Sequence, residues 1–442
     1  MRKQSRTRWI SAGGVAVLAS ALATGSVAMG DRHGGKDAGH HPASGGSSHS
    51  RVAKNVVLMV GDGLSIAARD AIRLSTVGKD GRLAMDKLRY AGWTYTDSED
   101  PDEAVTDSAA AATALATGVR TYNGAVSVDV DGRSHTTLLQ HAKKLRKSTG
   151  LVTTAQVTDA TPAAFGAHVP DRADQSEIAR QFLDVTKPDV ILGGGEDWWY
   201  PAGNAGAYPD DPADPRPEVS RSTKGNLVER ARSMGYQYVT NGSQLASARG
   251  HKLLGLFANE EMFEQAPEGQ GDEYAPVVPL ATMTTKALDV LDDNRHGFFL
   301  LVEEEGIDEM EHANNATQML AAGKAFDRTV AVVHSYAKRH PGTLVIVVGD
   351  HETGGLAIEN VDADDESGDA GSTSDDVRQS LEDGPFPIAG SGLEFTIDWT
   401  TGSHTGAATP LTAEGPGSVR LAQAQKNTHV FDVLLAAMRG GR

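Results

Sequence analysis

The chain has 442 residues, no cysteine and a formal net charge of −18 at pH 7. The acidic balance argues against nucleic acid and anionic membrane surfaces as partners, because both repel a strongly negative protein. Without cysteine the chain has no disulfides and no thiolate ligands, so histidine, aspartate and glutamate are the side chains left to bind a metal.

The first fifty residues are predicted to lie outside the folded domain. Residues 1–28 combine a basic start with a small, apolar run typical of a signal peptide, and a permanent membrane anchor is the alternative. Residues 29–50 are rich in glycine, serine and histidine and hold too few apolar side chains to form a core. We expect a disordered linker there, with metal delivery by its histidines as the alternative. The protein is therefore expected to be exported, and to be secreted, periplasmic or associated with the cell envelope.

Between residues 51 and 442, apolar runs alternate with amphipathic stretches. This alternation predicts a single α/β domain of three layers, α/β/α, with a central, mostly parallel sheet. The expected elements, in chain order, are strand 55–60, helix 137–147, strands 151–157, 190–192 and 298–302, helix 317–339 and strand 344–348. Acidic surface loops are expected near residues 208–217 and 362–384, and we interpret the second as solvated rather than as a calcium site.

Four potential ligands come directly after predicted strands. Asp62, Glu303 and the pair Asp350 and His351 each follow a different strand. The carboxyl ends of parallel strands meet at one edge of an open sheet, so we expect these side chains to lie close together. For any one of them a helix cap or a loop hydrogen bond would be the better interpretation, but their joint placement favours a binding site.

Two local spacings add further candidate ligands. Asp308 and His312 are four residues apart in a potentially helical segment, so they share one face and suit a zinc ion; a surface salt bridge is the alternative. Asp159 and Thr161 are two apart in a stretch predicted to be extended, which would point both to the same side. A carboxylate with a hydroxyl is better suited to magnesium than to zinc.

Ser108 opens a strongly helix-forming run, Ser-Ala-Ala-Ala-Ala-Thr-Ala-Leu. A serine in this position is commonly a helix N-cap. It would also lie at the positive end of the helix dipole, which favours an alkoxide and a bound phosphate. The two interpretations are compatible.

Six runs of this sequence resemble the alkaline phosphatase family and occur in that family's order. The most specific is Val105-Thr-Asp-Ser-Ala-Ala-Ala-Ala-Thr-Ala-Leu-Ala-Thr-Gly-Val-Arg-Thr-Tyr-Asn-Gly124, which contains Ser108. The other runs are residues 55–63, 159–164, 307–312, 348–355 and 403–406. They extend over most of the chain after the linker, so the set is far more specific than any single run.

The resemblance implies an enzyme that hydrolyses phosphate monoesters through a phosphoserine on Ser108, with two zinc ions and one magnesium ion. Arg172 matches the family's phosphate-binding arginine, and Asp107 would help to orient it. The first zinc would be held by Asp308, His312 and His404, the second by Asp62, Asp350 and His351, and the magnesium by Asp62, Asp159, Thr161 and Glu303. Three divalent cations would also offset the acidic charge that otherwise repels an anionic substrate.

The sequence departs from the family pattern near the first zinc. The usual Glu-Gly pair is replaced by Glu303-Glu304-Glu305-Gly306; we align Glu303 as the ligand because it lies five residues before Asp308, with Glu304 as the alternative. Glu309 stands where some members carry lysine or histidine, and is expected to alter phosphate release and the pH optimum. His168 resembles a family histidine near the site, and we interpret it as structural.

Two other functions are the alternatives. A phosphodiesterase or sulfatase can share this fold, because specificity depends on the shape of the pocket. A non-catalytic protein that binds phosphate or metal in the cell envelope is the second, and the intact set of nucleophile, ligands and arginine argues against it. The expected partners are small phosphate monoesters, with no nucleic acid and no stable membrane span after processing. The family resemblance further implies a homodimer.

Overall fold

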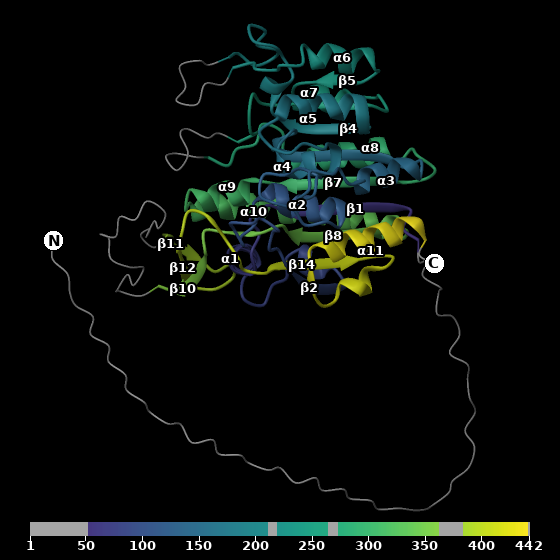
Figure 1. Cartoon of the computed structure of the whole chain (residues 1–442). Helices are drawn as coiled ribbons and strands as arrows, with labels where there is room; N and C mark the ends of the chain where they lie inside the picture. The colour runs from purple at the N-terminus through teal and green to yellow at the C-terminus, as the bar shows by residue number, and fades with distance from the viewer. Residues whose placement is uncertain (1–51, 211–218, 264–272, 362–382, 441–442) are drawn as a thin grey trace, which may run out of the picture. The chain divides into compact units, whose positions relative to one another are not determined.

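The computed structural model describes residues 52–210, 219–263, 273–361 and 383–440 (Figure 1). The predicted signal peptide and linker lie outside these residues, as do most of the two predicted acidic loops. The second loop was predicted to extend to residue 384, but Asp383 already begins a strand. Within the described residues, no helix combines the length and the apolar character needed to cross a bilayer.

A ten-stranded sheet forms the centre of the fold, in the order β15-β2-β14-β8-β1-β7-β3-β4-β6-β5. Its strands are β1 (Asn55–Gly61), β2 (Tyr90–Tyr95), β3 (Ser148–Gln156), β4 (Val190–Gly194), β5 (Gln237–Val239), β6 (Leu253–Leu256), β7 (Phe298–Glu304), β8 (Thr343–Gly349), β14 (Thr409–Glu414) and β15 (Ala424–Lys426). Every neighbouring pair from β8 to β5 is parallel, whereas β14 runs antiparallel to both β8 and β2. The predicted, mostly parallel α/β fold is confirmed.

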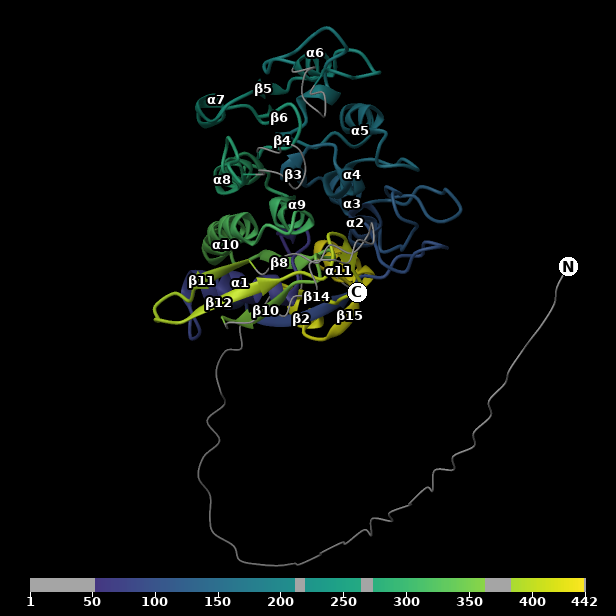
Figure 2. The ribbon, with the colours of Figure 1, turned by 90° about the vertical axis from the view of Figure 1, so that its left-hand side faces the viewer.

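Helices cover both faces of this sheet (Figure 2). One face is covered by α1 (Ile66–Val77), α7 (Gly242–Ser247), α8 (Leu280–Leu291), α9 (Gly306–His312) and α10 (Ala316–Arg339). The other is covered by α2 (Ser108–Thr117), α3 (Leu138–Lys144), α4 (Ala160–Gly166), α5 (Gln175–Gln181), α6 (Leu227–Ser233) and α11 (Thr428–Arg439). The remaining short helices are η1 (Met85–Lys87), η2 (Phe182–Thr186), η3 (Glu196–Trp198) and η4 (Ser418–Leu421).

Two small sheets complete the fold. One contains β10 (Ala357–Asn360), β12 (Glu394–Asp398) and β11 (Asp383–Pro387), all antiparallel. The other pairs β9 (Glu352–Thr353) with β13 (His404–Thr405), so that His404 lies opposite Thr353. This short pairing carries a residue from the C-terminal part of the chain to the end of β8.

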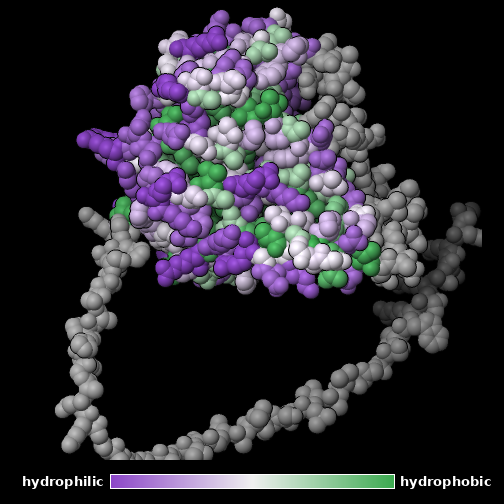
Figure 3. All heavy atoms as spheres, turned by 180° about the vertical axis from the view of Figure 1, so that it is seen from behind, coloured by the Kyte–Doolittle hydropathy of each residue, from purple (hydrophilic) through white to green (hydrophobic). Residues whose placement is uncertain are grey.

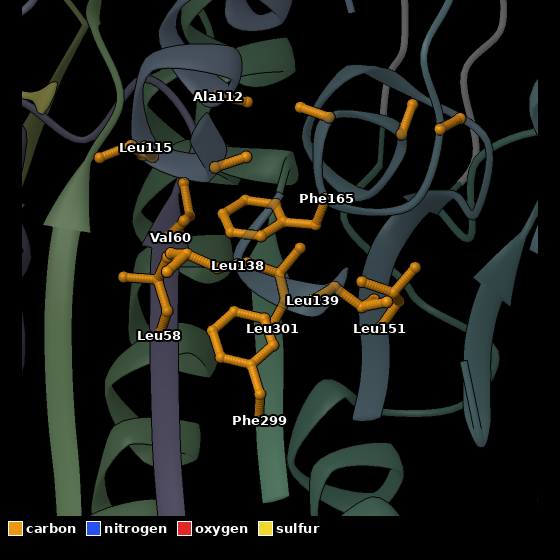
Figure 4. Packing of buried hydrophobic residues seen from close by; sticks show 14 of the residues in the cluster. Leu58, Val60, Ala112, Leu115, Leu138, Leu139, Leu151, Phe165, Phe299 and Leu301 are labelled. Atoms are coloured by element: carbon orange, nitrogen blue, oxygen red, sulfur yellow. The ribbon is translucent and has the colours of Figure 1, made fainter. Parts of the chain in front are cut away.

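The two faces of the central strands pack into two separate hydrophobic cores. In β1, Leu58 belongs to the core under α2, α3, α4 and α11, and the adjacent Met59 belongs to the core under α1, α8 and α10. This alternation follows from the two-residue period of a strand. Phe165 of α4 stacks on Phe299 of β7, with ring centroids 5.7 Å apart (Figure 4). Viewed from behind, the surface mixes hydrophilic and hydrophobic side chains (Figure 3).

The predicted elements are present with small shifts of their ends, but one local prediction is wrong. Asp159 and Thr161 do not lie in an extended stretch: Asp159 is the N-cap residue of α4, and Thr161 lies in its first turn. Pro162 follows in the same turn. A proline is tolerated in a first helical turn, because the N–H groups there have no partner within the helix.

Candidate active site

The carboxyl ends of β1, β7 and β8 bring the strand-end residues together. Val60 pairs with Val348 on one side and with Glu303 on the other. His351 Nε2 lies 3.2 Å from Asp62 Oδ1 and 3.3 Å from Asp350 Oδ2. Residues almost 300 positions apart in sequence are therefore direct neighbours at one edge of the sheet.

Ser108 points into this cluster from the N-terminus of α2. Its Oγ lies 3.0 Å from His351 Nε2, and the residue is 4% exposed. The N-cap residue of α2 is Asp107, whose Oδ1 accepts from the N–H of Ala110 at 2.9 Å. Asp107, and not Ser108, is therefore the N-cap residue of α2. Because Asp107 caps the helix, the Ser108 hydroxyl is not needed for capping.

Backbone carbonyls fix the orientation of two imidazoles. His312 Nδ1 donates to the Gly402 carbonyl at 2.8 Å, and His404 Nδ1 donates to the Thr106 carbonyl at 2.9 Å. In a neutral ring this leaves Nε2 as an acceptor, and the two Nε2 atoms face each other at 3.1 Å. Two lone pairs at this distance need a proton or a cation between them.

Thr353 orients the third imidazole. Its hydroxyl donates to Asp308 Oδ1, and its oxygen lies 3.3 Å from His351 Nδ1 and can accept that N–H. The Nε2 lone pair of His351 therefore also points into the cluster. Sequence reasoning missed Thr353, Thr106 and Gly402, because contacts through backbone carbonyls and neighbouring strands leave no pattern in the sequence.

Two compact sets of donor atoms result. Asp308, His312 and His404 form one, and Asp62, Asp308 and His351 form the other, with the donor atoms of each set within 4.8 Å of one another. Asp62 Oδ1 and Asp350 Oδ2 are buried without a hydrogen-bond partner. Buried carboxylates facing unprotonated imidazole nitrogens are the donor set of a divalent cation, so these residues fit the metals that the resemblance implies.

Gly63 lets α9 approach the end of β1. It has φ 70°, and a Cβ atom there would lie 2.8 Å from Asp308 Cα. A side chain at this position would therefore separate Asp62 from the ligands of α9. Glycine is the residue that combines this backbone conformation with so close an approach.

The residues expected to bind magnesium are less compact. Glu303 Oε2 accepts from the Thr153 hydroxyl at 2.6 Å, and burial raises the pKa of Glu303 to about 7. Thr161 is 1% exposed, and its Oγ1 is buried without a hydrogen-bond partner. Among the described residues, the carboxylates of Asp62, Asp159 and Glu303 do not form a third set whose donor atoms all lie within 4.8 Å of one another.

Glu304 is turned away from this group, because adjacent residues of β7 point to opposite faces. It accepts from the hydroxyls of Tyr274 at 2.6 Å and Thr154 at 2.8 Å. Its two oxygens are thus occupied on the other side of the sheet. The geometry favours Glu303 over Glu304 as the residue that faces Asp159 and Arg172.

Arg172 reaches the same cavity between two carboxylates. Its Nη2 lies 2.9 and 3.1 Å from the oxygens of Asp159, and its Nη1 lies 3.4 Å from Asp107 Oδ2. Asp107 Oδ2 also accepts from the N–H of Gly124 at 3.0 Å. Burial would lower the pKa of Arg172, but the charges of Asp159 and Asp107 raise it, so the guanidinium stays charged. Asp107 therefore connects the start of α2 with this arginine.

The cavity has a volume of about 420 Å³, and its wall includes Ser108, Arg172, His312 and His404. Burial, followed by the charge of Asp350, raises the pKa of Asp62. Asp308 raises the pKa of His312 to about 10. These raised pKa values favour a proton on Asp62 and His312 when no cation is bound.

His168 lies outside the cavity wall. Its Nε2 donates to the His135 carbonyl at 2.8 Å, and its backbone carbonyl accepts from Gln181 Nε2 at 3.0 Å. Burial lowers the pKa of His168, which favours the neutral ring. These contacts support the structural interpretation of this residue.

Comparison with known proteins identifies relatives over most of the chain. A sequence profile described as alkaline phosphatase matches residues 53–381. The streptomycin-6-phosphate phosphatase of Streptomyces griseus is 37% identical, and the match covers 87% of this chain and 90% of that protein. The alkaline phosphatase of Escherichia coli K12 is 30% identical, and the match covers 89% of this chain and 87% of that protein. The solved alkaline phosphatase of the Antarctic bacterium TAB5 has a TM-score of 0.70 and 27% identity, and covers 88% of this chain and 100% of its own. That of Thermus thermophilus has a TM-score of 0.71 and 25% identity, covering 89% and 93%.

Proposed function

The chain belongs to the alkaline phosphatase family and is a phosphatase, and from this premise we propose that it hydrolyses phosphate monoesters through a phosphoserine on Ser108. The observation that carries the proposal is the position of Ser108 Oγ, 3.0 Å from His351 Nε2 in a cavity that Arg172 also lines. The Streptomyces griseus relative is named for a phosphate monoester, which favours this substrate class over diesters.

The family is metal-dependent, and the proposal assigns three ions to this chain. The first zinc would be held by Asp308, His312 and His404, the second by Asp62, Asp350 and His351, and the magnesium by Asp62, Asp159, Thr161 and Glu303. When bound, such ions would stabilise the charge on the entering and leaving oxygens and supply water of lowered pKa, near ~7 for zinc. The second assignment includes Asp350 because its Oδ2 lies beside His351 Nε2.

The chain's own residues would perform the displacement in two steps. Arg172 binds two phosphate oxygens through its planar guanidinium, and the N-terminus of α2 adds a favourable dipole. Ser108 Oγ attacks phosphorus, the bond from phosphorus to the alcohol oxygen breaks, and the serine proton ends on the alcohol. Water then attacks the phosphoserine, the bond from phosphorus to Oγ breaks, and inorganic phosphate leaves with the serine hydroxyl restored.

The test compares 4-nitrophenyl phosphate with bis(4-nitrophenyl) phosphate, with and without EDTA, in the wild type and in Ser108→Ala. We expect monoester hydrolysis that EDTA abolishes, a loss of at least ~10³-fold in kcat for Ser108→Ala, and a phosphoserine at Ser108 after acid quenching, detected by mass spectrometry. Preferred hydrolysis of the diester would favour the phosphodiesterase alternative. Phosphate or metal binding without turnover of either ester would favour the non-catalytic one.

Export and dimerisation are part of the proposal. Cleavage after residue 28 predicts a mature protein in the culture medium or envelope fraction whose N-terminus begins at Met29. The homodimer implied by the family predicts twice the chain mass in light scattering. An N-terminus that still begins at residue 1 would contradict the first prediction, and a monomer mass the second.

A further inference from the structure

The wall of the active-site cavity is acidic. Arg172 is the only lysine or arginine among its described lining residues. Four of the acids face cationic or nitrogen partners: Asp107 and Asp159 contact Arg172, and Asp62 and Asp308 face imidazoles. The wall holds three further carboxyl groups, which the proposed chemistry does not use.

Glu103 is held over the cavity from the loop that precedes α2. Its Oε2 accepts from Asn123 Nδ2 at 3.0 Å, and the same nitrogen donates to the Val105 carbonyl at 2.9 Å. Asn123 Oδ1 in turn accepts from the N–H of Asp107 at 3.1 Å. This network ties the exposed carboxylate of Glu103 to the segment that carries the nucleophile.

Glu305 and Glu309 come from α9 and line the same cavity. Glu305 is 4% exposed, and its Oε2 is buried without a hydrogen-bond partner. Glu309 follows Asp308 directly in α9 and is partly exposed. An unsatisfied buried acceptor beside a second carboxylate is the kind of wall that attracts a cation.

We propose that this cavity selects phosphate monoesters whose alcohol carries a positive charge, with Glu103 and Glu309 attracting that charge from two elements of its wall. The inference rests on the proposed monoesterase function and specifies its substrate class. The phosphate would be bound at Ser108 and Arg172, so the alcohol must point toward the rest of the cavity wall. A cationic group there would be attracted by the exposed carboxylate of Glu103 and by the partly exposed one of Glu309, and salt would weaken this attraction.

The test uses two substrates of nearly the same shape. Phosphocholine carries a quaternary ammonium, and 3,3-dimethylbutyl phosphate replaces that nitrogen with carbon, so the pair isolates charge. We expect kcat/KM to be about 10-fold higher for phosphocholine at low salt, and the ratio to fall toward 1 as NaCl screens the attraction. In the double variant Glu103→Gln/Glu309→Gln, the kcat/KM ratio should also fall to about 1. Each single variant should have an intermediate ratio.

Glu229→Gln serves as the matched control, because Glu229 is an exposed acid of α6 outside the cavity wall. It should leave the ratio at the wild-type value. The proposed substrate class is overturned if the kcat/KM ratio of the wild type is near 1, or if the double variant keeps the wild-type ratio. In either case, hydrolysis of both esters would still support the monoesterase function. If neither ester nor 4-nitrophenyl phosphate is hydrolysed, both proposals fail. The salt dependence tests the inference even if the double variant does not fold.

Discussion

At the scale of single residues, hydrogen bonds behind the imidazoles determine what the site can bind. Thr106, Gly402 and Thr353 accept the Nδ1 protons of His404, His312 and His351, so each Nε2 faces the centre. Two of these acceptors are backbone carbonyls and cannot be removed by substitution. Thr353 is the one that a side-chain change can test.

Thr353→Val should weaken zinc binding. Valine has nearly the shape of threonine but cannot accept from His351 Nδ1 or donate to Asp308 Oδ1. We expect a loss of about 10- to 100-fold in zinc affinity, measured by competition with a chromogenic chelator, with a fall in kcat. Thr329→Val is the control, because Thr329 is equally buried and its hydroxyl donates within α10, to the Ala325 carbonyl. Equal zinc affinity in the two variants would contradict this role for Thr353.

At the scale of elements, α2 is positioned at both ends. Asp107 caps its start, and Gly118 ends it in the left-handed region at φ 75°. A Cβ atom at Gly118 would lie 2.5 Å from Cδ1 of Phe431, which belongs to α11. The glycine therefore allows α11 to pack closely against the helix that carries Ser108.

Gly118→Ala should destabilise the protein by about 2–5 kcal/mol. Left-handed backbone costs an alanine about 1–2 kcal/mol, and the collision with Phe431 adds about 1–3 kcal/mol of overpacking. Urea unfolding would measure the change. Gly225→Ala provides the comparison, since Gly225 has φ 78° and a methyl group added there would meet nothing within 4 Å, so only the backbone cost applies. Equal losses in the two variants would rule out the packing explanation.

At the scale of the whole molecule, the sheet gathers negative charge at one edge. Asp62, Glu303 and Asp350 arrive there from three strands and are buried. Burial raises their pKa values, to about 7 for Glu303, and repulsion from neighbouring carboxylates adds to the shift. Without metal the folded state therefore binds more protons than the unfolded state, and loses stability as the pH rises from the unfolded value of about 4.5 through 7.

Removal of metal should therefore cost more at high pH. Bound cations replace those protons and stabilise the folded state by mass action, so we expect EDTA to lower Tm by at least about 10 °C at pH 8 and by much less at pH 5. Differential scanning calorimetry at both pH values would measure this, and added zinc and magnesium should restore Tm. An EDTA effect that is absent, or is larger at pH 5, would contradict the account.

Several features followed from the sequence alone because they depend on local pattern. The apolar runs located the central strands and predicted their parallel arrangement, and the positions of Asp62, Asp350 and His351 after strand ends predicted that these side chains meet. The helical spacing of Asp308 and His312 likewise placed both on one face. Two- and 3.6-residue periods and strand direction carry this information without any tertiary contact.

Other features were decided only by the tertiary structure. Asp107 rather than Ser108 caps α2, and Glu303 rather than Glu304 faces Arg172, because partners from distant segments select between adjacent residues. The buried acceptor of Glu305 in the cavity wall is equally invisible in the sequence. A sequence states which groups are present, but hydrogen bonding and burial depend on what else reaches the same place, and only the folded chain determines that.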